Sequence, residues 1–260
     1  AAERALAPHH LVDCIAPQQD FSAAEYGRRA REVVAEILAR GKRPFVVGGT
    51  GLYIKALLQG LTAAAPSDRS VRSRLRREAE AVGLPALHRR LERLDPESAA
   101  RIHPNDGFRI VRALEVHTLT GATMSAAHQA HGFPAPPYET LKLGLRIERA
   151  ALYARIDARV EAMLAEGFLA EVKRLRGIGL DPRCKALQSL RYRHLNAYLD
   201  GTIEWEEAVR TLKRDHRRYA KRQMTWFGAD PEVEWVDPRA TSAAAARIAG
   251  FLESRDAPRD

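Results

Sequence analysis

Apolar residues recur along the chain with two periods, and these predict which segments are helices and which are strands. After Ser22, which can cap a helix, apolar residues follow at helical spacing as far as Gly41. The short apolar run at residues 45–47 predicts a strand, and the leucines within residues 52–58 predict a helix directly after it. Helix, strand and helix in alternation are typical of a parallel α/β sheet.

The segment at residues 62–141 has a different pattern, with almost no runs of β-branched residues. Its periodicity predicts three helices, between loops at residues 64–66 and 133–137. The predicted helices are residues 68–82, 84–94 and 105–120. We therefore predict a helical insertion domain at residues 62–141, within a discontinuous α/β core formed by residues 1–61 and 142–260.

The rest of the chain returns to the α/β pattern. Residues 141–147 alternate with period two, as a strand does, and a second short strand is predicted at residues 233–236. Helices are predicted between residues 149 and 176, at 205–227 and at 242–252, followed by a frayed tail.

Composition limits the classes of function. The 260 residues are 45% hydrophobic, enough for a sizeable core, and carry a formal net charge of +9 with a pI near 9.9. An excess of Lys and Arg favours a polyanionic partner such as a nucleic acid. The chain has no apolar run long enough to cross a membrane and no signal-like start, so we expect a cytoplasmic protein without a membrane partner.

Cysteines and histidines do not predict a metal site or a disulfide. Cys14 and Cys184 lie far apart without a C-x-x-C pair, so we expect both to be reduced. His9 and His10 are adjacent and would point apart on a strand. The histidines at positions 128 and 131 have a spacing that zinc ligands use, but no further ligands accompany them.

The joint at residues 45–58 is a candidate ligand site. Gly48 and Gly49 end the predicted strand, and a helix is predicted to begin just after Thr50. In open α/β sheets such joints stand at the carboxyl ends of strands, where ligands bind. The Thr50 hydroxyl can cap the helix or meet a substrate, and the spacing alone leaves both open.

A strongly basic helix is predicted near the carboxyl end. Residues 210–222 contain seven Lys or Arg and one acid, Asp215. The stripe predicted to pack inward is Val209, Leu212, Tyr219, Gln223 and Trp226, and the outer arc is Arg210, Arg214, Arg217, Arg218 and Lys221. Solvated faces usually interleave acids, which are missing here. A helix that tracks phosphates is therefore favoured over an ordinary solvated face.

A second basic pair is predicted at the start of another helix. Residues 105–106 can cap a helix in which Arg109 and Arg112 fall on one face. Two guanidiniums side by side suit a phosphate or diphosphate group. The alternative is surface charge near Glu115, and the residues alone do not decide between the two.

Four blocks in this order resemble the bacterial tRNA dimethylallyltransferases, also called tRNA isopentenyltransferases. The blocks are residues 8–13, 46–57, 103–115 and 221–227, and the resemblance runs from about Pro8 to Trp235. The resemblance implies a P-loop NTPase-like α/β fold, which in turn implies that the protein binds a nucleotide such as ATP. It also implies a monomeric, cytoplasmic enzyme. The implied reaction moves a dimethylallyl group from dimethylallyl diphosphate to N6 of the adenosine 3′-adjacent to the anticodon, with Mg²⁺ as cofactor and diphosphate as product.

The resemblance also assigns roles to individual residues. Thr50 is expected beside the target adenine as a catalytic residue. The residues expected to bind the tRNA anticodon loop or diphosphate are Thr50, Arg72, Phe108, Arg109, Ile110, Val111, Arg112, Tyr192, Arg193, Arg214, Arg217, Lys221, Arg222 and Gln223. Where the family often carries Gly-Tyr-Arg, this chain has Arg191 in place of the glycine, which puts that local contact in doubt.

Two parts of the family pattern are not found. The family begins with a phosphate loop of the type G-x-x-x-x-G-K-[ST] and a strand that ends in a general-base Asp, and the 260 residues contain neither. We therefore expect an N-terminal segment of roughly 45 residues to be missing and the chain alone to be inactive. Two alternatives are an adenylate isopentenyltransferase, whose acceptor is a free nucleotide, and a non-catalytic RNA-binding module.

Overall fold

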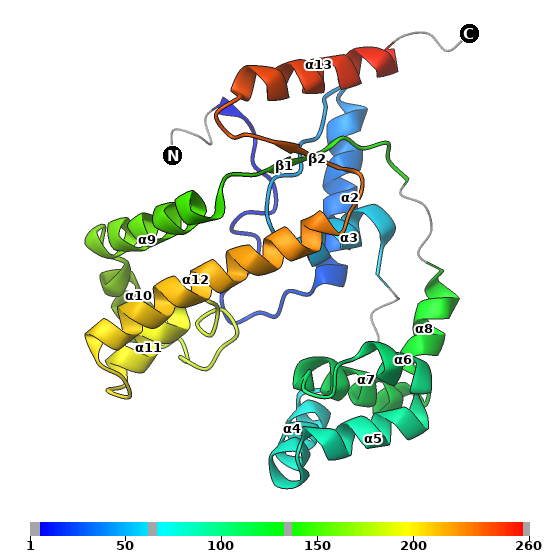
Figure 1. Cartoon of the computed structure of the whole chain (residues 1–260), viewed down its shortest axis with the longest axis vertical. Coiled ribbons are helices and arrows are strands. Elements are labelled where there is room, and N and C mark those ends of the chain that lie inside the picture. Colours follow the sequence, from blue (N-terminus) through cyan, green and yellow to red (C-terminus); the bar gives the residue numbers. More distant parts are fainter. Residues whose placement is uncertain (1–5, 62–66, 133–136, 257–260) are drawn as a thin grey trace. The chain divides into compact units, whose positions relative to one another are not determined.

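The computed structural model describes residues 6–61, 67–132 and 137–256, with side chains as far as residue 254 (Figure 1). The chain divides into two compact units, which we call the sheet unit and the helical unit. The sheet unit is residues 1–22, 45–51 and 138–260, and the helical unit is residues 23–44 and 52–137. The predicted loop at 64–66, residues 133–136 of the predicted loop at 133–137, and the tail after residue 256 lie outside the described residues. The predicted domain limits at 62–141 stay a prediction.

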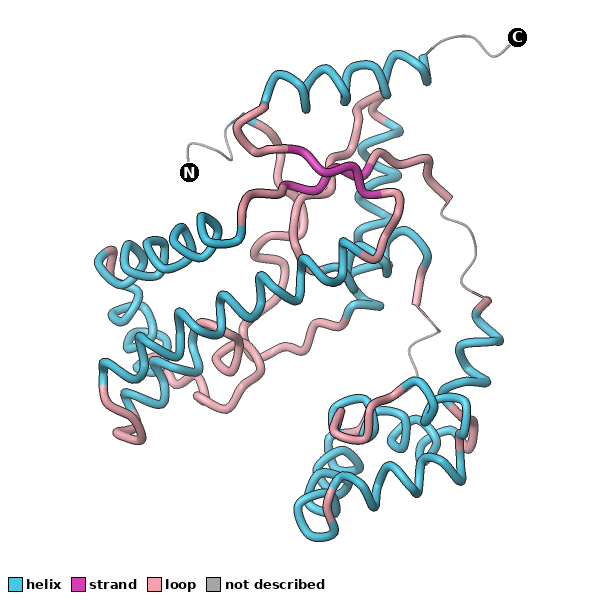
Figure 2. The backbone as a smooth tube through the Cα atoms, in the orientation of Figure 1, coloured by secondary structure: helices cyan, strands magenta, loops and turns pink. Residues whose placement is uncertain are grey.

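A short parallel sheet forms one part of the sheet unit (Figure 2). Strands β1 (Lys142–Leu145) and β2 (Val233–Val236) pair in parallel, with Lys142 opposite Val233. The Lys142 ammonium lies 2.8 Å from Asp230 and 2.6 Å from Glu232, just before β2, so these ion pairs favour this register. Strand β1 lies within the segment at 141–147 that alternates with period two, and β2 coincides with the second strand predicted at 233–236. The sheet and its surrounding helices confirm the α/β class.

The strand predicted at residues 45–47 was wrong. Phe45, Val46 and Val47 are 66%, 45% and 93% exposed and form no strand. A strand depends on hydrogen bonds to a neighbour, and within the described residues the only paired strands are β1 and β2. The apolar run therefore remains an extended loop, although its residue types have high strand propensity.

Among its described residues, the sheet unit also contains the helices α9 (Arg149–Ala165), α10 (Phe168–Gly177), α11 (Tyr192–Leu199), α12 (Trp205–Gly228) and α13 (Thr241–Asp256). The helix predicted at 205–227 is confirmed as α12. The helical stretch predicted at 149–176 is divided by Gly167, whose φ of 97° lies in the left-handed region that ends helices. Phe168, Val172 and Leu195 form a small buried cluster of α10 and α11.

The helical unit contains α2 (Ala23–Ala39), α3 (Gly51–Gln59), α4 (Arg69–Val82), α5 (Leu84–Leu94), α6 (Pro96–Arg101), α7 (Gly107–Thr120) and α8 (Met124–His131); the first residue of α3 belongs to the sheet unit. Its core includes Leu91, Ile110 and Leu114, each at most 1% exposed. Asp68 and Asp106 cap α4 and α7 by accepting backbone hydrogen bonds. The three helices predicted in this region are confirmed. Among the described helices, none is both long and apolar enough to span a bilayer.

The glycine between α9 and α10 gives a stability prediction. A Cβ at Gly167 or Gly177 meets no atom within 4 Å, so only the backbone distinguishes the two positions. We expect Gly167→Ala to destabilise by about 1–2 kcal/mol, because alanine is strained at positive φ. Gly177→Ala, at the last residue of α10, should be neutral or stabilising by up to about 1 kcal/mol. Urea unfolding measures both, and equal effects would contradict the assigned backbone conformations.

Candidate functional site

The glycine loop at residues 48–51 contacts the last turns of α12 within the sheet unit. The Gln223 side chain donates a hydrogen bond from Nε2 to the Gly49 carbonyl oxygen, at 2.8 Å. A Cβ on Gly49 would lie 1.9 Å from that nitrogen, and one on Gly51 would lie 2.0 Å from the Trp226 ring nitrogen. Only glycine allows this approach. Two of the sequence blocks, far apart in the chain, therefore meet at one place.

Thr50 lies at the centre of this contact and is exposed. Helix α3 begins at the next residue, as predicted. Yet the Thr50 hydroxyl makes no hydrogen bond to any residue that the structure describes, so the capping bond is not formed here. The hydroxyl is free to meet a ligand beside Gln223 and Trp226.

Residues 210–222 contain a single acid, as the sequence shows, but further acidic partners reach α12 from a neighbouring helix. The Arg217 guanidinium lies 2.6 Å from Asp157, and Lys213 pairs with Glu161, both on α9. Arg210 pairs with Glu207 on α12 itself, at 2.7 Å. A scan along one helix cannot reveal partners that packing brings from another.

The inward face of α12 also differs from the predicted stripe. Its buried residues are Ala208, Thr211, Leu212, Asp215 and Ala220, and only Leu212 was expected. The predicted Trp226 is 45% exposed, and Val209, Tyr219 and Gln223 are half-buried. Because α12 packs against both α9 and α11, the face that it buries is displaced from the apolar stripe and includes a carboxylate.

Lys221 and Arg222 remain exposed near the end of α12. Neither forms an ion pair with any described residue. The Arg222 guanidinium lies over the Tyr219 ring, 5.5 Å from its centre. This turn leads directly to Gln223, so the cations of α12 without an acidic partner adjoin the glycine loop.

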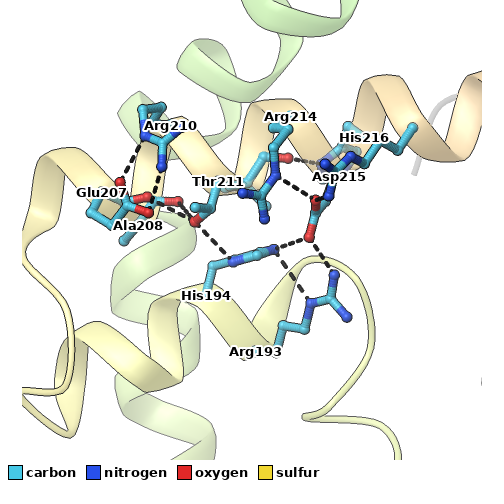
Figure 3. A network of polar contacts seen from close by, with 11 residues as sticks. Arg193, His194, Glu207, Ala208, Arg210, Thr211, Arg214, Asp215 and His216 are labelled. Carbon is cyan, nitrogen blue, oxygen red and sulfur yellow. Dashed lines mark hydrogen bonds and ion pairs between the residues drawn. The ribbon is translucent and has the colours of Figure 1, made fainter.

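Asp215 is the centre of a polar network between α11 and α12 (Figure 3). Its side chain is only 8% exposed. Arg214 donates to it from Nε at 2.9 Å, Arg193 donates from Nη2, and a nitrogen of Arg218 lies 3.5 Å away. Burial alone would raise the pKa of Asp215, but the hydrogen bonds from Arg214 and Arg193 outweigh it and lower that pKa to about 2.

His194 closes the network on its buried side. Its ring lies between Thr211 and Asp215, with Nδ1 3.1 Å from the Thr211 hydroxyl and Nε2 3.3 Å from the carboxylate (Figure 3). Thr211 donates its own proton to the Glu207 carbonyl oxygen at 2.7 Å, so the hydroxyl accepts from Nδ1. Burial and the Arg193 charge lower the pKa of His194, which keeps the ring neutral near pH 7.

Tyr192 is an anchor rather than an exposed contact. Its hydroxyl donates to Glu171 at 2.5 Å, and its ring packs edge-on against Phe168. Burial and the Glu171 hydrogen bond raise the pKa of Tyr192 to about 12. The side chain fixes α11 on α10 and so places the neighbouring Arg193.

Glu115 has the same role in the helical unit as Asp215 in the sheet unit. Its side chain is 0% exposed and accepts from Arg72 at 3.0 and 3.1 Å, from Arg112 at 2.8 Å and from the Asp68 backbone at 2.9 Å. Burial would raise the pKa of Glu115, but these hydrogen bonds lower it. Arg112 is therefore held beside Arg72, not beside Arg109.

The predicted contacts at residues 108–112 separate into exposed and buried ones. Phe108 is 75% exposed, and the side chain of Arg109 is 67% exposed and bound to Asp106 at 2.6 Å. Ile110 is 0% exposed, so it belongs to the core and offers no side chain to a ligand. A small hollow of about 30 Å³ is lined by Arg72, Arg76, Phe108, Val111 and Arg112.

Sequence reasoning missed Asp215 and Glu115 as organisers of these arginines. Their signals were a single acid within a basic run and a glutamate one turn after Arg112. It also missed Arg76, which lines the hollow and forms no ion pair with a described residue. Within the described residues, no three His, Cys, Asp or Glu side chains are placed to hold a metal ion.

Comparisons with known proteins identify the relatives of this chain. The sequence profile of the family described as IPP transferase matches residues 1–230. The chain is 51% identical over 246 residues to the tRNA dimethylallyltransferase of Syntrophobacter fumaroxidans, covering 95% of this chain and 72% of the relative. It is also 51% identical over 238 residues to that of Desulfosudis oleivorans, covering 92% and 76%.

Two solved structures are similar over almost the whole chain. The full-length tRNA isopentenylpyrophosphate transferase of Bacillus halodurans has a TM-score of 0.68 at 39% identity, covering 98% of this chain and 81% of that one. A eukaryotic dimethylallyltransferase acting on tRNA has a TM-score of 0.78 at 25% identity, covering 100% and 69%.

The Asp215 network predicts a pH dependence of stability. Because the folded pKa of about 2 lies below the ordinary 3.8, the ionised carboxylate stabilises the fold above about pH 4. That contribution is lost as the pH falls towards 2. We expect the difference in unfolding free energy between wild type and Asp215→Asn to shrink by about 2 kcal/mol between pH 6 and pH 2. Urea unfolding measures it, and a difference independent of pH would contradict the network.

Proposed function

The chain belongs to the IPP transferase family, and we propose that it binds tRNA for dimethylallyl transfer. The acceptor is N6 of the adenosine 3′-adjacent to the anticodon, and the donor is dimethylallyl diphosphate. The observation that carries the proposal is the glycine loop, which presents the free hydroxyl of Thr50 beside Gln223 and Trp226. Relatives over 95% and 92% of the chain are named for this reaction, which supports the assignment.

The proposed chemistry is a nucleophilic displacement. The exocyclic nitrogen of adenine attacks the allylic carbon, the bond from that carbon to the diphosphate oxygen breaks, and a carboxylate takes the amine proton. The base must leave the stack of the anticodon loop to reach the donor. Thr50 orients the amine, and Lys221 with Arg222 binds the RNA backbone next to it.

The family resemblance implies a phosphate loop and a general-base Asp for this chemistry. The 260 residues contain no G-x-x-x-x-G-K-[ST] motif, and the described residues form no three-ligand metal site. We therefore assign tRNA binding and the Thr50 contact to this chain. The cofactor Mg²⁺, the donor, nucleotide (ATP) binding, the monomeric state and the cytoplasmic location stay predictions from the family.

Charge favours a tRNA acceptor over a free nucleotide. Arginines gather around Asp215 in the sheet unit and around Glu115 in the helical unit, and Lys221 and Arg222 add further positive charge. A mononucleotide has too few phosphates to use these surfaces, whereas an RNA stem and loop can meet several. If no transfer is found, a non-catalytic RNA-binding module is the function that remains.

An assay with labelled dimethylallyl diphosphate, Mg²⁺ and unmodified tRNA tests the proposal. We expect the 260-residue chain to bind tRNA without transfer, because it contains no phosphate loop. A chain extended at Ala1 with the phosphate-loop segment of a relative should transfer the group to tRNA and not to AMP. Turnover by the 260 residues alone would show that the catalytic groups have been assigned to the wrong residues. Transfer to AMP would favour the adenylate enzyme.

Thr50→Val in the extended chain tests the role of the hydroxyl. We expect kcat to fall by roughly 10- to 1,000-fold with little change in tRNA affinity, as for a lost transition-state hydrogen bond. If Thr50 serves only as a helix cap, the substitution should instead cost about 1 kcal/mol of stability and leave the rate unchanged. Single-turnover kinetics and a thermal melt distinguish the two roles.

A further inference from the structure

Three arginines of the sheet unit share one buried carboxylate. The side chains of Arg193, Arg214 and Arg218 are 44%, 37% and 63% exposed, whereas the Asp215 side chain beneath them is 8% exposed. Figure 3 shows Arg193 and Arg214 reaching the carboxylate from two helices, α11 and α12. The positive groups therefore lie towards the solvent and the negative group lies towards the protein.

The cluster keeps positive charge and hydrogen-bond donors after its internal contacts are made. Three guanidinium charges and one carboxylate charge leave an excess of two, because His194 is neutral. Each guanidinium has five N–H donors. Arg193 and Arg214 each use one on Asp215, Arg193 uses another on His194 at 3.4 Å, and the Arg218 guanidinium lies 3.5 Å from the carboxylate. Donors held in a fixed arrangement lose less side-chain entropy when they bind a phosphate than mobile ones do.

We infer that Asp215 is a positioning residue for RNA binding, and that its carboxylate holds Arg193, Arg214 and Arg218 as one site for a backbone phosphate. The inference rests on the proposed function, because it takes tRNA as the ligand. The hydrogen bond from Tyr192 to Glu171 fixes the start of α11 on α10 and so fixes the backbone position of Arg193. His194, whose Nδ1 is bound to Thr211, accepts a hydrogen bond at Nε2 from Arg193, at 3.4 Å, and so helps to hold that guanidinium.

Charge and positioning predict opposite effects when this carboxylate is removed. Asp215→Asn raises the net charge by one, so a surface that acts through charge alone should bind RNA more tightly. A surface that depends on fixed guanidiniums should bind more weakly, because the arginines lose the acceptor that aligns them. The sign of the change therefore distinguishes the two explanations.

Glu207→Gln supplies a matched control on the same helix. It makes the same change of charge, but the one ion pair of Glu207 with a described residue is to Arg210, at 2.7 Å, and the two side chains are well exposed, at 40% and 63%. Filter binding of tRNA over a salt series compares the wild type, Glu207→Gln and Asp215→Asn. Circular dichroism and a thermal melt identify variants that do not fold.

We expect Glu207→Gln to bind tRNA as tightly as the wild type or slightly more tightly. Asp215→Asn should bind about tenfold more weakly, with a log–log salt slope lower by about one, as for the loss of one phosphate contact. Equal or tighter binding by folded Asp215→Asn would overturn the inference. If the wild type itself does not bind tRNA, the proposed function and the inference fail together.

Two further variants keep the test decisive if Asp215→Asn does not fold. Arg193→Gln and Arg214→Gln each remove one donor from the proposed phosphate site. If the two arginines bind one phosphate together, the double variant should lose clearly less affinity than the sum of the single losses. Additive losses would assign the arginines to independent contacts and overturn the shared site.

Discussion

Each unit depends on a buried carboxylate that gathers arginine side chains. An isolated carboxylate would be costly to bury, and a group of unpaired arginines would repel one another. Asp215 and Glu115 resolve both problems, because each accepts charge-assisted hydrogen bonds from two arginines on its own unit. The arginines keep their charge, since guanidinium does not deprotonate in proteins. Each unit thereby gains an ordered cationic surface rather than a set of mobile side chains.

A second constraint is the close approach of backbone to side chain at the glycine loop. Gly49 and Gly51 leave no room for a Cβ, because Gln223 and Trp226 occupy the space where it would stand. This contact joins the candidate catalytic hydroxyl of Thr50 to the last turn of the basic helix. Asp215 lies near the middle of the same helix. One rigid element therefore positions both the arginines around Asp215 and the Gln223 and Trp226 side chains beside Thr50.

The sequence predicted what local patterns determine. Periodicity placed α5 at its observed bounds and both strands in the right segments, because their side chains follow regular helical or alternating spacing. It could not show that residues 45–47 lack a partner strand, since pairing is a property of the whole fold. For the same reason it missed Asp157 and Glu161, which reach α12 only because α9 packs beside it. Asp215 was visible as a single acid among cations, but its burial depends on α11.

We propose that the buried carboxylates hold the arginines that bind RNA. A crystal structure of the chain with an anticodon stem–loop RNA tests it most directly. We expect RNA phosphates within hydrogen-bond distance of Arg193 and Arg214 in the sheet unit and of Arg72 or Arg112 in the helical unit. Asp215 and Glu115 should keep their ion pairs in that complex. RNA bound on another surface, or arginines that leave their carboxylates to reach it, would contradict the account.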